Sequence, residues 1–350
     1  MRFSLRVNND LDIRTLASAA VAADNAGFEQ MWVSHDLMMR SAPALVGALA
    51  VKTERIHLGI GIMNPYSVHP AELAMTAATL QEISNGRFLL GLSAGAGEFL
   101  AWIGVEQQRP LSRTREALRA IRGLLAGQRP SEIDGTGADW TEHAYLRMPT
   151  QQVPIYLGAM SPKMLELAGR EADGVLALSF PPEHFTTARR HVEDGAASID
   201  RSMDSIDVPA CVWLSVDEDK EKADRALAVK LAYYGASFSP YLLARVGLVP
   251  EDFAESDQAL RDGDIEKAIS GITPQMLRLG ISGDPDSVVS RCQEIKAAGV
   301  SHLSFGPPLG AEPVNAIELI GSEILPRLRS SSIGLDGPSS PTSAWRAATS

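Results

Sequence analysis

The feature that most constrains the fold is a regular alternation of short apolar runs with longer segments of helical spacing. The apolar runs predict eight strands, over residues 3–7, 31–33, 56–60, 88–92, 155–157, 174–178, 208–216 and 303–305. The intervening segments predict helices, over 11–26, 43–52, 70–83, 112–125, 162–172, 183–199 and 317–328. Strands that alternate with helices pair in parallel through right-handed crossovers. We therefore expect a (β/α)8 TIM barrel, with an open doubly wound sheet as the alternative.

Three stretches define the expected domain organisation. Residues 1–328 predict one barrel domain, which suits a chain of this length. Residues 233–281 interrupt the alternation between the seventh and eighth predicted strands with several glycines and prolines, and predict a helical insertion that forms a lid. Residues 329–350 are rich in Ser, Pro, Gly and Ala and predict a disordered tail.

Charge and composition exclude several function classes. The chain has 32 Lys and Arg against 43 Asp and Glu, and this net charge of −11 argues against a nucleic-acid partner. The sequence contains no long apolar run and no opening signal segment, so we expect no membrane association and a cytoplasmic location. The two cysteines, Cys211 and Cys292, are expected to be buried small residues, and the scattered histidines indicate no metal site.

In a barrel the chemistry lies where the strands end, so residues after each strand are the candidates. The second strand is followed by His35 and Asp36, which predict either an acid–base pair or a contact to a ligand's polar edge. The alternative is a helix-entry loop in which a neighbour satisfies His35. Adjacent side chains diverge, so we expect one of the two to face the site.

Three small-residue loops allow a backbone to approach a ligand. The first is the glycine-containing end of strand three, at 59–62. The second, Gly91 to Glu98, lacks the order and the distant acid of a dinucleotide fingerprint, but its amides can approach a ring or a phosphate. The third is Gly158-Ala159-Met160-Ser161 before Pro162, where a helix start predicts either an anion site or simple capping.

Taken in order, four runs resemble the luciferase-like monooxygenase superfamily. They are GIGIMNPYSVHP at 59–70, ISNGRFLLGLSAGAGEFLAWIG at 83–104, VPIYLGAMSPKMLELAG at 153–169 and GVSHLSFGPPLG at 299–310. Within that superfamily they look most similar to methylene-tetrahydromethanopterin reductases, which use coenzyme F-420, an 8-hydroxy-5-deazaflavin. The resemblance covers residues 1–328.

The resemblance implies where a cofactor would lie. A bulge after the third strand, with a non-prolyl cis peptide at Gly61-Ile62, would support one face of the ring. Ala94, Gly95 and Ala96 would border the ring, and Asp36 would contact it. Gly158 and Ala159-Met160-Ser161 would hold the phosphate through backbone amides. The family also implies a homodimer formed through the early helices.

The chain departs from the reductases at four places. It has His35-Asp36 where they carry Asp-His, and it has Arg6, Ala96 and Ala244 where they carry acidic residues. Losing these carboxylates removes groups that would handle protons or contact a pterin. Arg6 would then face the substrate as an anion partner.

The first hypothesis is therefore an oxidoreductase that moves a hydride between coenzyme F-420 and a small organic substrate. The second keeps the fold but uses FMN and oxygen, as a luciferase-like monooxygenase. The third is a paralogue that binds the flavin or deazaflavin without catalysis. The substrate itself is not predicted.

Overall fold

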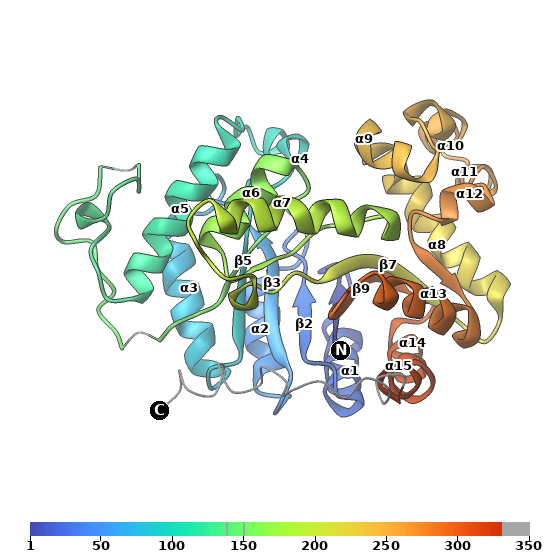
Figure 1. Ribbon diagram of the computed structural model, residues 1–350, viewed down its shortest axis with the longest axis horizontal. Helices are drawn as coiled ribbons and strands as arrows, with labels where there is room; N and C mark the ends of the chain where they lie inside the picture. Colours follow the sequence, from blue (N-terminus) through green and yellow to red (C-terminus); the bar gives the residue numbers. More distant parts are fainter. Residues whose placement is uncertain (138, 150, 331–350) are drawn as a thin grey trace.

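A curled parallel sheet organises the molecule, and helices cover its outside in the computed structural model (Figure 1). The structure describes residues 1–137, 139–149 and 151–330. Within them the strands are β1 (Arg2–Val7), β2 (Gln30–Val33), β3 (His57–Met63), β4 (Phe88–Leu92), β5 (Ile155–Leu157), β6 (Gly174–Val175), β7 (Ala210–Val216), β8 (Ile281–Gly283) and β9 (His302–Leu309).

Helices follow the strands in the alternation that the sequence predicts. Those of the first half are α1 (Ile13–Ala26), α2 (Ala42–Ala50), α3 (Pro70–Ile83), α4 (Gly97–Trp102), α5 (Pro110–Leu125), α6 (Pro162–Glu171), the 3-10 turn η2 (Pro182–His184) and α7 (Phe185–Ala197). Those of the second half are α8 (Lys220–Tyr234), α9 (Pro240–Leu243), η5 (Ala244–Val246), α10 (Ala254–Arg261), α11 (Ile265–Ser270), α12 (Pro274–Leu277), α13 (Pro285–Ala297), α14 (Pro313–Leu319) and α15 (Leu325–Ser330).

The strand order is β6-β5-β4-β3-β2-β1-β9-β7-β8, and every pairing is parallel. All eight predicted strands are present, so the parallel α/β class is confirmed. The count of eight is wrong for the sheet, because β8 pairs with β7 through Leu214 and Ile281. A strand of three residues leaves too little alternation to be recognised in the sequence.

The β6 edge of the sheet comes close to the residues just before β7. Gly174 in β6 forms an isolated parallel bridge with Asp207, and Val175 N–H donates to Asp207 O at 2.9 Å. Farther along, Phe180 N–H donates to Cys211 O in β7 at 2.7 Å. These bonds give the sheet its curl.

Local capping chemistry explains where the first helix begins and ends. The carboxylate of Asp12 accepts from the backbone N–H groups of Arg14 and Thr15 at the start of α1. Gly27 ends that helix with φ 78°, the left-handed conformation that favours glycine. Both features are local, because each depends on a residue type placed directly before or after the helical segment.

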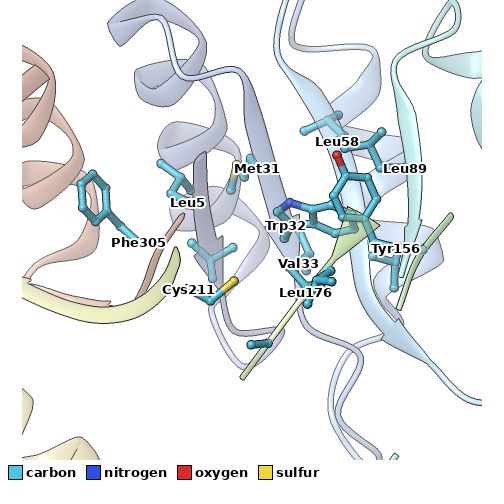
Figure 2. Packing of buried hydrophobic residues seen from close by; sticks show 14 of the residues in the cluster. Leu5, Met31, Trp32, Val33, Leu58, Leu89, Tyr156, Leu176, Cys211 and Phe305 are labelled. Atoms are coloured by element: carbon cyan, nitrogen blue, oxygen red, sulfur yellow. The ribbon is translucent and has the colours of Figure 1, made fainter. Parts of the chain in front are cut away.

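The main core fills the space between the strands and their helices, with Leu5, Met31 and Phe305 completely buried (Figure 2). Trp32 meets Tyr156 edge to face, with ring centroids 4.9 Å apart (Figure 2). Cys211 and Cys292 are free and fully buried, as predicted.

A second apolar cluster joins β7 to the helices of the predicted insertion. Trp213 of β7 joins it to the sheet, and its other members come from residues 227–279. Helices α9 to α12, together with three short 3-10 turns, occupy most of the 233–281 segment, where the sequence predicts a helical insertion. That this segment acts as a lid stays a prediction.

Two sequence predictions concern the ends and environment of the chain. In the described part of the chain, none of the helices combines the length and apolar character needed to span a bilayer. The predicted disordered tail lies outside the described residues, except that Arg329 and Ser330 form the end of α15.

Candidate active site

The candidate residues come from loops at the carboxyl end of the sheet, which we call the mouth. In a parallel sheet these ends lie on one edge, so loops far apart in sequence can meet there. The predicted residues follow β2, β3, β4 and β5, which are neighbours in the sheet. The strand order therefore brings the predicted cofactor loops side by side.

The end of β3 has the irregularity that the resemblance implies. Its register with β4 shifts between Ile60 and Met63, and the Gly61-Ile62 peptide bond is cis. The predicted bulge and cis bond are both confirmed. A side chain at Gly61 would displace Leu176, because a Cβ there would lie 2.4 Å from Leu176 Cδ2.

The loop after β4 is held from outside by a glutamine side chain. The Nε2 atom of Gln107 donates to the carbonyls of Ala94 (3.0 Å) and Gly95 (2.9 Å). Gly95 has φ 75°, and Ala96 is the N-cap of α4 without a side-chain bond to the helix. The loop thus presents small residues and fixed backbone at the mouth.

The loop after β5 is tied to its neighbour and ends in an unused cap. The Ser93 hydroxyl donates to Gly158 O at 2.8 Å, which joins the loops after β4 and β5. Ser161 is the N-cap of α6 and Pro162 occupies the first turn, as predicted. The Ser161 hydroxyl makes no bond to the helix. Met164 N–H donates to Ser161 O at 3.1 Å, so the first-turn amides left for a ligand are those of Ser161 and Lys163. The residues present thus fit a phosphate group.

His35 and Asp36 turn to different partners, as adjacent side chains were expected to do. The N–H of Ala42, the first residue of α2, donates to His35 Nδ1 at 3.3 Å. A neighbour at the helix entry thus satisfies this nitrogen, as in the alternative interpretation of the sequence. Burial lowers the pKa of His35, against the opposing charge of Asp36. An acceptor at Nδ1 places the proton of the neutral ring on Nε2, which makes Nε2 the donor.

Asp36 is anchored to the loop that follows β1. Its Oδ2 accepts from the Ser34 hydroxyl at 3.0 Å, and its backbone carbonyl accepts from Asn9 Nδ2 at 3.1 Å. Its charge acts on two residues of α8: burial and this charge raise the pKa of Tyr234, whereas burial lowers the pKa of Lys230 to about 8 against the charge of Asp36. Asp36 therefore lies near the side of the mouth formed by α8.

Arg6 is buried, and all of its terminal N–H groups have partners. Nη1 donates to the carbonyls of Ala177 (2.8 Å) and Leu178, and Nη2 to those of Val212 (3.0 Å) and Ser304 (3.2 Å). Burial lowers its pKa. The structure thus corrects the picture of a guanidinium free to grip a substrate: four carbonyls hold its terminal groups, while Nε has no partner.

Three further groups at this end of the sheet escaped the sequence analysis. The ring of Trp213 in β7 is fully buried with its Nε1 unpaired. Lys230 Nζ lies 3.9 Å from the ring centre of Tyr234 and 5.4 Å from that of Trp213. No local pattern marks Trp213 or Lys230, because their meeting depends on how α8 packs on β7.

Ala244, the third position aligned to a family carboxylate, lies away from these groups in sequence and begins η5. Ala96 is the N-cap of α4. Neither side chain can exchange a proton. The titratable groups described above at the mouth are those of His35, Asp36, Lys230 and Tyr234.

Comparison with known proteins agrees with this arrangement. Residues 1–302 match the family model described as luciferase-like monooxygenase. A 5,10-methylenetetrahydromethanopterin reductase of Archaeoglobus fulgidus is 34% identical over 334 residues, covering 94% of this chain and all of the relative. A coenzyme F-420-dependent glucose-6-phosphate dehydrogenase of Nakamurella multipartita is 31% identical, covering 90% of this chain and 92% of the relative.

A solved structure gives the same answer at the level of the fold. The coenzyme F-420-dependent tetrahydromethanopterin reductase of Methanopyrus kandleri superposes with a TM-score of 0.86 at 32% identity, covering 93% of this chain and 98% of that one. The sequence match extends along nearly the whole described chain. It includes the loops at the strand ends on which the resemblance rests. The chain belongs to the luciferase-like monooxygenase family.

Proposed function

We propose that this chain is a coenzyme F-420-dependent oxidoreductase that moves a hydride between the deazaflavin and an organic substrate. The observation that carries the proposal is the similarity, over 94% of the chain, to a reductase of the type solved from Methanopyrus kandleri as a coenzyme F-420 enzyme. When bound, the cofactor would supply the hydride chemistry at its carbon 5.

The chain's own residues would position the two reactants. Gly61 and Ile62 would support one ring face, with Ala94, Gly95 and Ala96 along its border. Gly158, Ala159, Met160 and Ser161 would hold the phosphate, which the unused Ser161 hydroxyl and the start of α6 support. In this arrangement the protein contacts would hold the ring and the substrate in the orientation that hydride transfer requires.

Proton handling would fall to the loop after β2. His35 is neutral at pH 7 because its pKa is lowered by burial, so its Nε2–H could donate to a polar edge of the ring or substrate. Asp36 would hold its carboxylate toward α8. Arg6 would contribute a fixed positive charge behind the substrate.

The architecture and assembly follow the same proposal. We propose that the curled sheet closes as a (β/α)8 barrel, supported by the bond from Phe180 N–H to Cys211 O, with the 233–281 insertion as its lid. A homodimer, which sedimentation velocity would detect, and a cytoplasmic location stay predictions.

The deciding experiment is reconstitution with each cofactor. Fluorescence titration should show tight binding of coenzyme F-420, and a mass spectrum of protein purified from a deazaflavin-producing host should contain it. Tight FMN binding with no F-420 binding would instead favour the monooxygenase. Binding of F-420 without turnover of any hydride donor or acceptor would favour the non-catalytic paralogue.

The phosphate loop allows a sharper test. Ser161→Ala should weaken F-420 binding about tenfold to a hundredfold, because one hydrogen bond to a charged group is removed. The matched ligand is the same deazaflavin without its phosphate, whose binding should not change. Equal losses for both ligands would show that Ser161 does not contact the phosphate.

A further inference from the structure

We propose that the substrate carries an anionic group, a carboxylate or a phosphate, which binds at the mouth beside Lys230 and Trp213 with Arg6 behind them. This substrate class rests on the proposed function, because it assumes that the mouth is the active site. Three side chains at this place can donate hydrogen bonds or carry positive charge, but they cannot accept a hydrogen bond.

Arg6 brings a buried positive charge that no acid neutralises. Its four acceptors are neutral backbone carbonyls, and among the described residues no carboxylate lies within ion-pair distance of it. A buried charge is normally paired, because leaving water without an opposite charge is costly. The Nε–H group also lacks an acceptor.

Trp213 adds a second orphaned donor at the same place. A Cβ built on Gly306 would lie 2.5 Å from Arg6 Nη2 and 3.1 Å from Trp213 Cδ1, so both side chains border this glycine. The indole Nε1, which adjoins Cδ1 in the ring, is buried without a partner. An indole N–H can only donate, so an acceptor is required.

Lys230 supplies the accessible cation. Its ammonium group lies over the ring of Tyr234 and near that of Trp213, and no carboxylate of the described residues pairs with it. It is half-buried, unlike Arg6, so a ligand can reach it. Burial and the charge of Arg6 both disfavour its charged form, which brings its pKa down to about 8 despite Asp36 and Asp10.

The nearby acids do not cancel this arrangement. Asp36 accepts from the Ser34 hydroxyl, and the exposed Asp10 follows β1; both act on Lys230 without forming an ion pair. Two cations and an orphaned indole N–H thus converge on one side of the mouth. An anion would pair with Lys230, accept from the indole N–H and lie in the field of Arg6, whereas a neutral substrate gives neither cation an ion-pair partner.

The test measures anion binding directly, on protein without cofactor and on protein loaded with F-420. Calorimetric titrations with inorganic phosphate and with acetate, at constant ionic strength, should show saturable binding of at least one of them at a single site. Preference for phosphate or for acetate identifies the chemical group. Lys230→Gln should weaken that binding about tenfold, the loss of one charge-assisted contact.

Lys222→Gln is the matched control, because it removes the same charge from an exposed position of the same helix and should leave binding unchanged. Equal effects of the two variants, or no saturable binding, would overturn the proposal; in the latter case water is the partner of the orphaned donors. F-420 binding is measured separately by fluorescence. Its failure would refute the proposed function, whereas intact F-420 binding without anion binding would refute the substrate class alone.

Discussion

Single residues at the mouth are constrained by atoms from distant strands, and Gly306 is the clearest case. It lies in β9 against the guanidinium of Arg6 and the indole of Trp213. The end of an arginine side chain is usually free to move aside. Here four carbonyls fix it, so a methyl group at position 306 has no room.

We expect Gly306→Ala to lower the free energy of unfolding by about 1–3 kcal/mol, the usual cost of overpacking a tight site. Urea denaturation measures it. The control is Gly47→Ala in α2, where the new methyl group meets only Leu80 Cδ2 at 3.6 Å and helix propensity favours alanine. An unchanged or higher stability of Gly306→Ala would show that Arg6 can move.

A buried polar cluster lies at the amino ends of the strands, opposite the mouth, and its stability also depends on individual residues. Both carboxylate oxygens of Asp207 lie 3.0 Å from His302 Nδ1, and Oδ2 accepts from Tyr156 Oη at 2.8 Å. The Ser4 hydroxyl lies 2.9 Å from His302 Nε2. Burial opposes the ionised form of Asp207, but these neighbours and Arg2 outweigh it and lower its pKa to about 2.

Asp207→Asn should therefore destabilise the protein by about 3 kcal/mol, since it removes the charge that the partners face. In the wild type, the contribution is complete above pH 3.8 and is lost as the pH falls toward 2. Asp286→Asn, in a mostly exposed ion pair with Arg327, should cost less than about 1 kcal/mol. Comparable losses in the two variants would contradict a buried ionised cluster.

At the scale of elements, the contact between η2 and the insertion is set by one histidine. His184 of η2 is buried, and its ring nitrogens have no hydrogen-bond partner. Its ring packs edge-on against those of Phe180 and Tyr241 in α9, with ring centroids 5.2 Å and 5.4 Å apart. Burial and the charges of Arg245 in η5 and His191 in α7 lower its pKa to about 4. The ring therefore has to be neutral for α9 and η5 to stay in place.

This gives a pH dependence with a defined sign. A basic group whose pKa falls on folding contributes stability above its ordinary pKa of 6.5 and loses it as the pH drops toward 4. Backbone amides of 241–246 should exchange faster at pH 5 than at pH 7.5, after correction for intrinsic rates. His184→Phe should abolish the difference, whereas His143→Phe, at an exposed site, should keep it.

At the scale of the molecule, the division between the main core and the second apolar cluster separates the stability of the insertion from that of the sheet. Phe253 is fully buried in the second cluster, where its ring meets Gly235. Trp213 is the residue of the sheet that belongs to that cluster. The insertion can thus loosen while the strands stay paired.

Phe253→Ala should cost about 3–5 kcal/mol locally, as expected when a buried ring is removed. Hydrogen exchange should rise across residues 235–279 and stay unchanged in β1 to β5. Leu5→Ala, within the main core, is the contrasting variant and should raise exchange throughout. A uniform increase in Phe253→Ala would mean that the two clusters unfold as one unit.

The sequence by itself determined the elements and the loops that carry the candidate site. Periodicity predicts the strands and helices, while Gly27 and Ser161 mark a helix end and a helix start, because these signals depend on residues close together in the chain. The loops proposed to hold the cofactor stand out in the sequence for the same reason: each is a short contiguous motif at the end of a strand.

Only the tertiary structure decided which partners the candidate side chains meet. The acceptors of Arg6 lie 171 to 298 positions away in sequence. The meeting of Trp213 with Lys230, the burial of His184 and the pairing of β8 likewise depend on packing between elements. Burial and pairing across the sheet fix these contacts, and no local pattern encodes them, so a buried guanidinium and a free one look identical in the sequence.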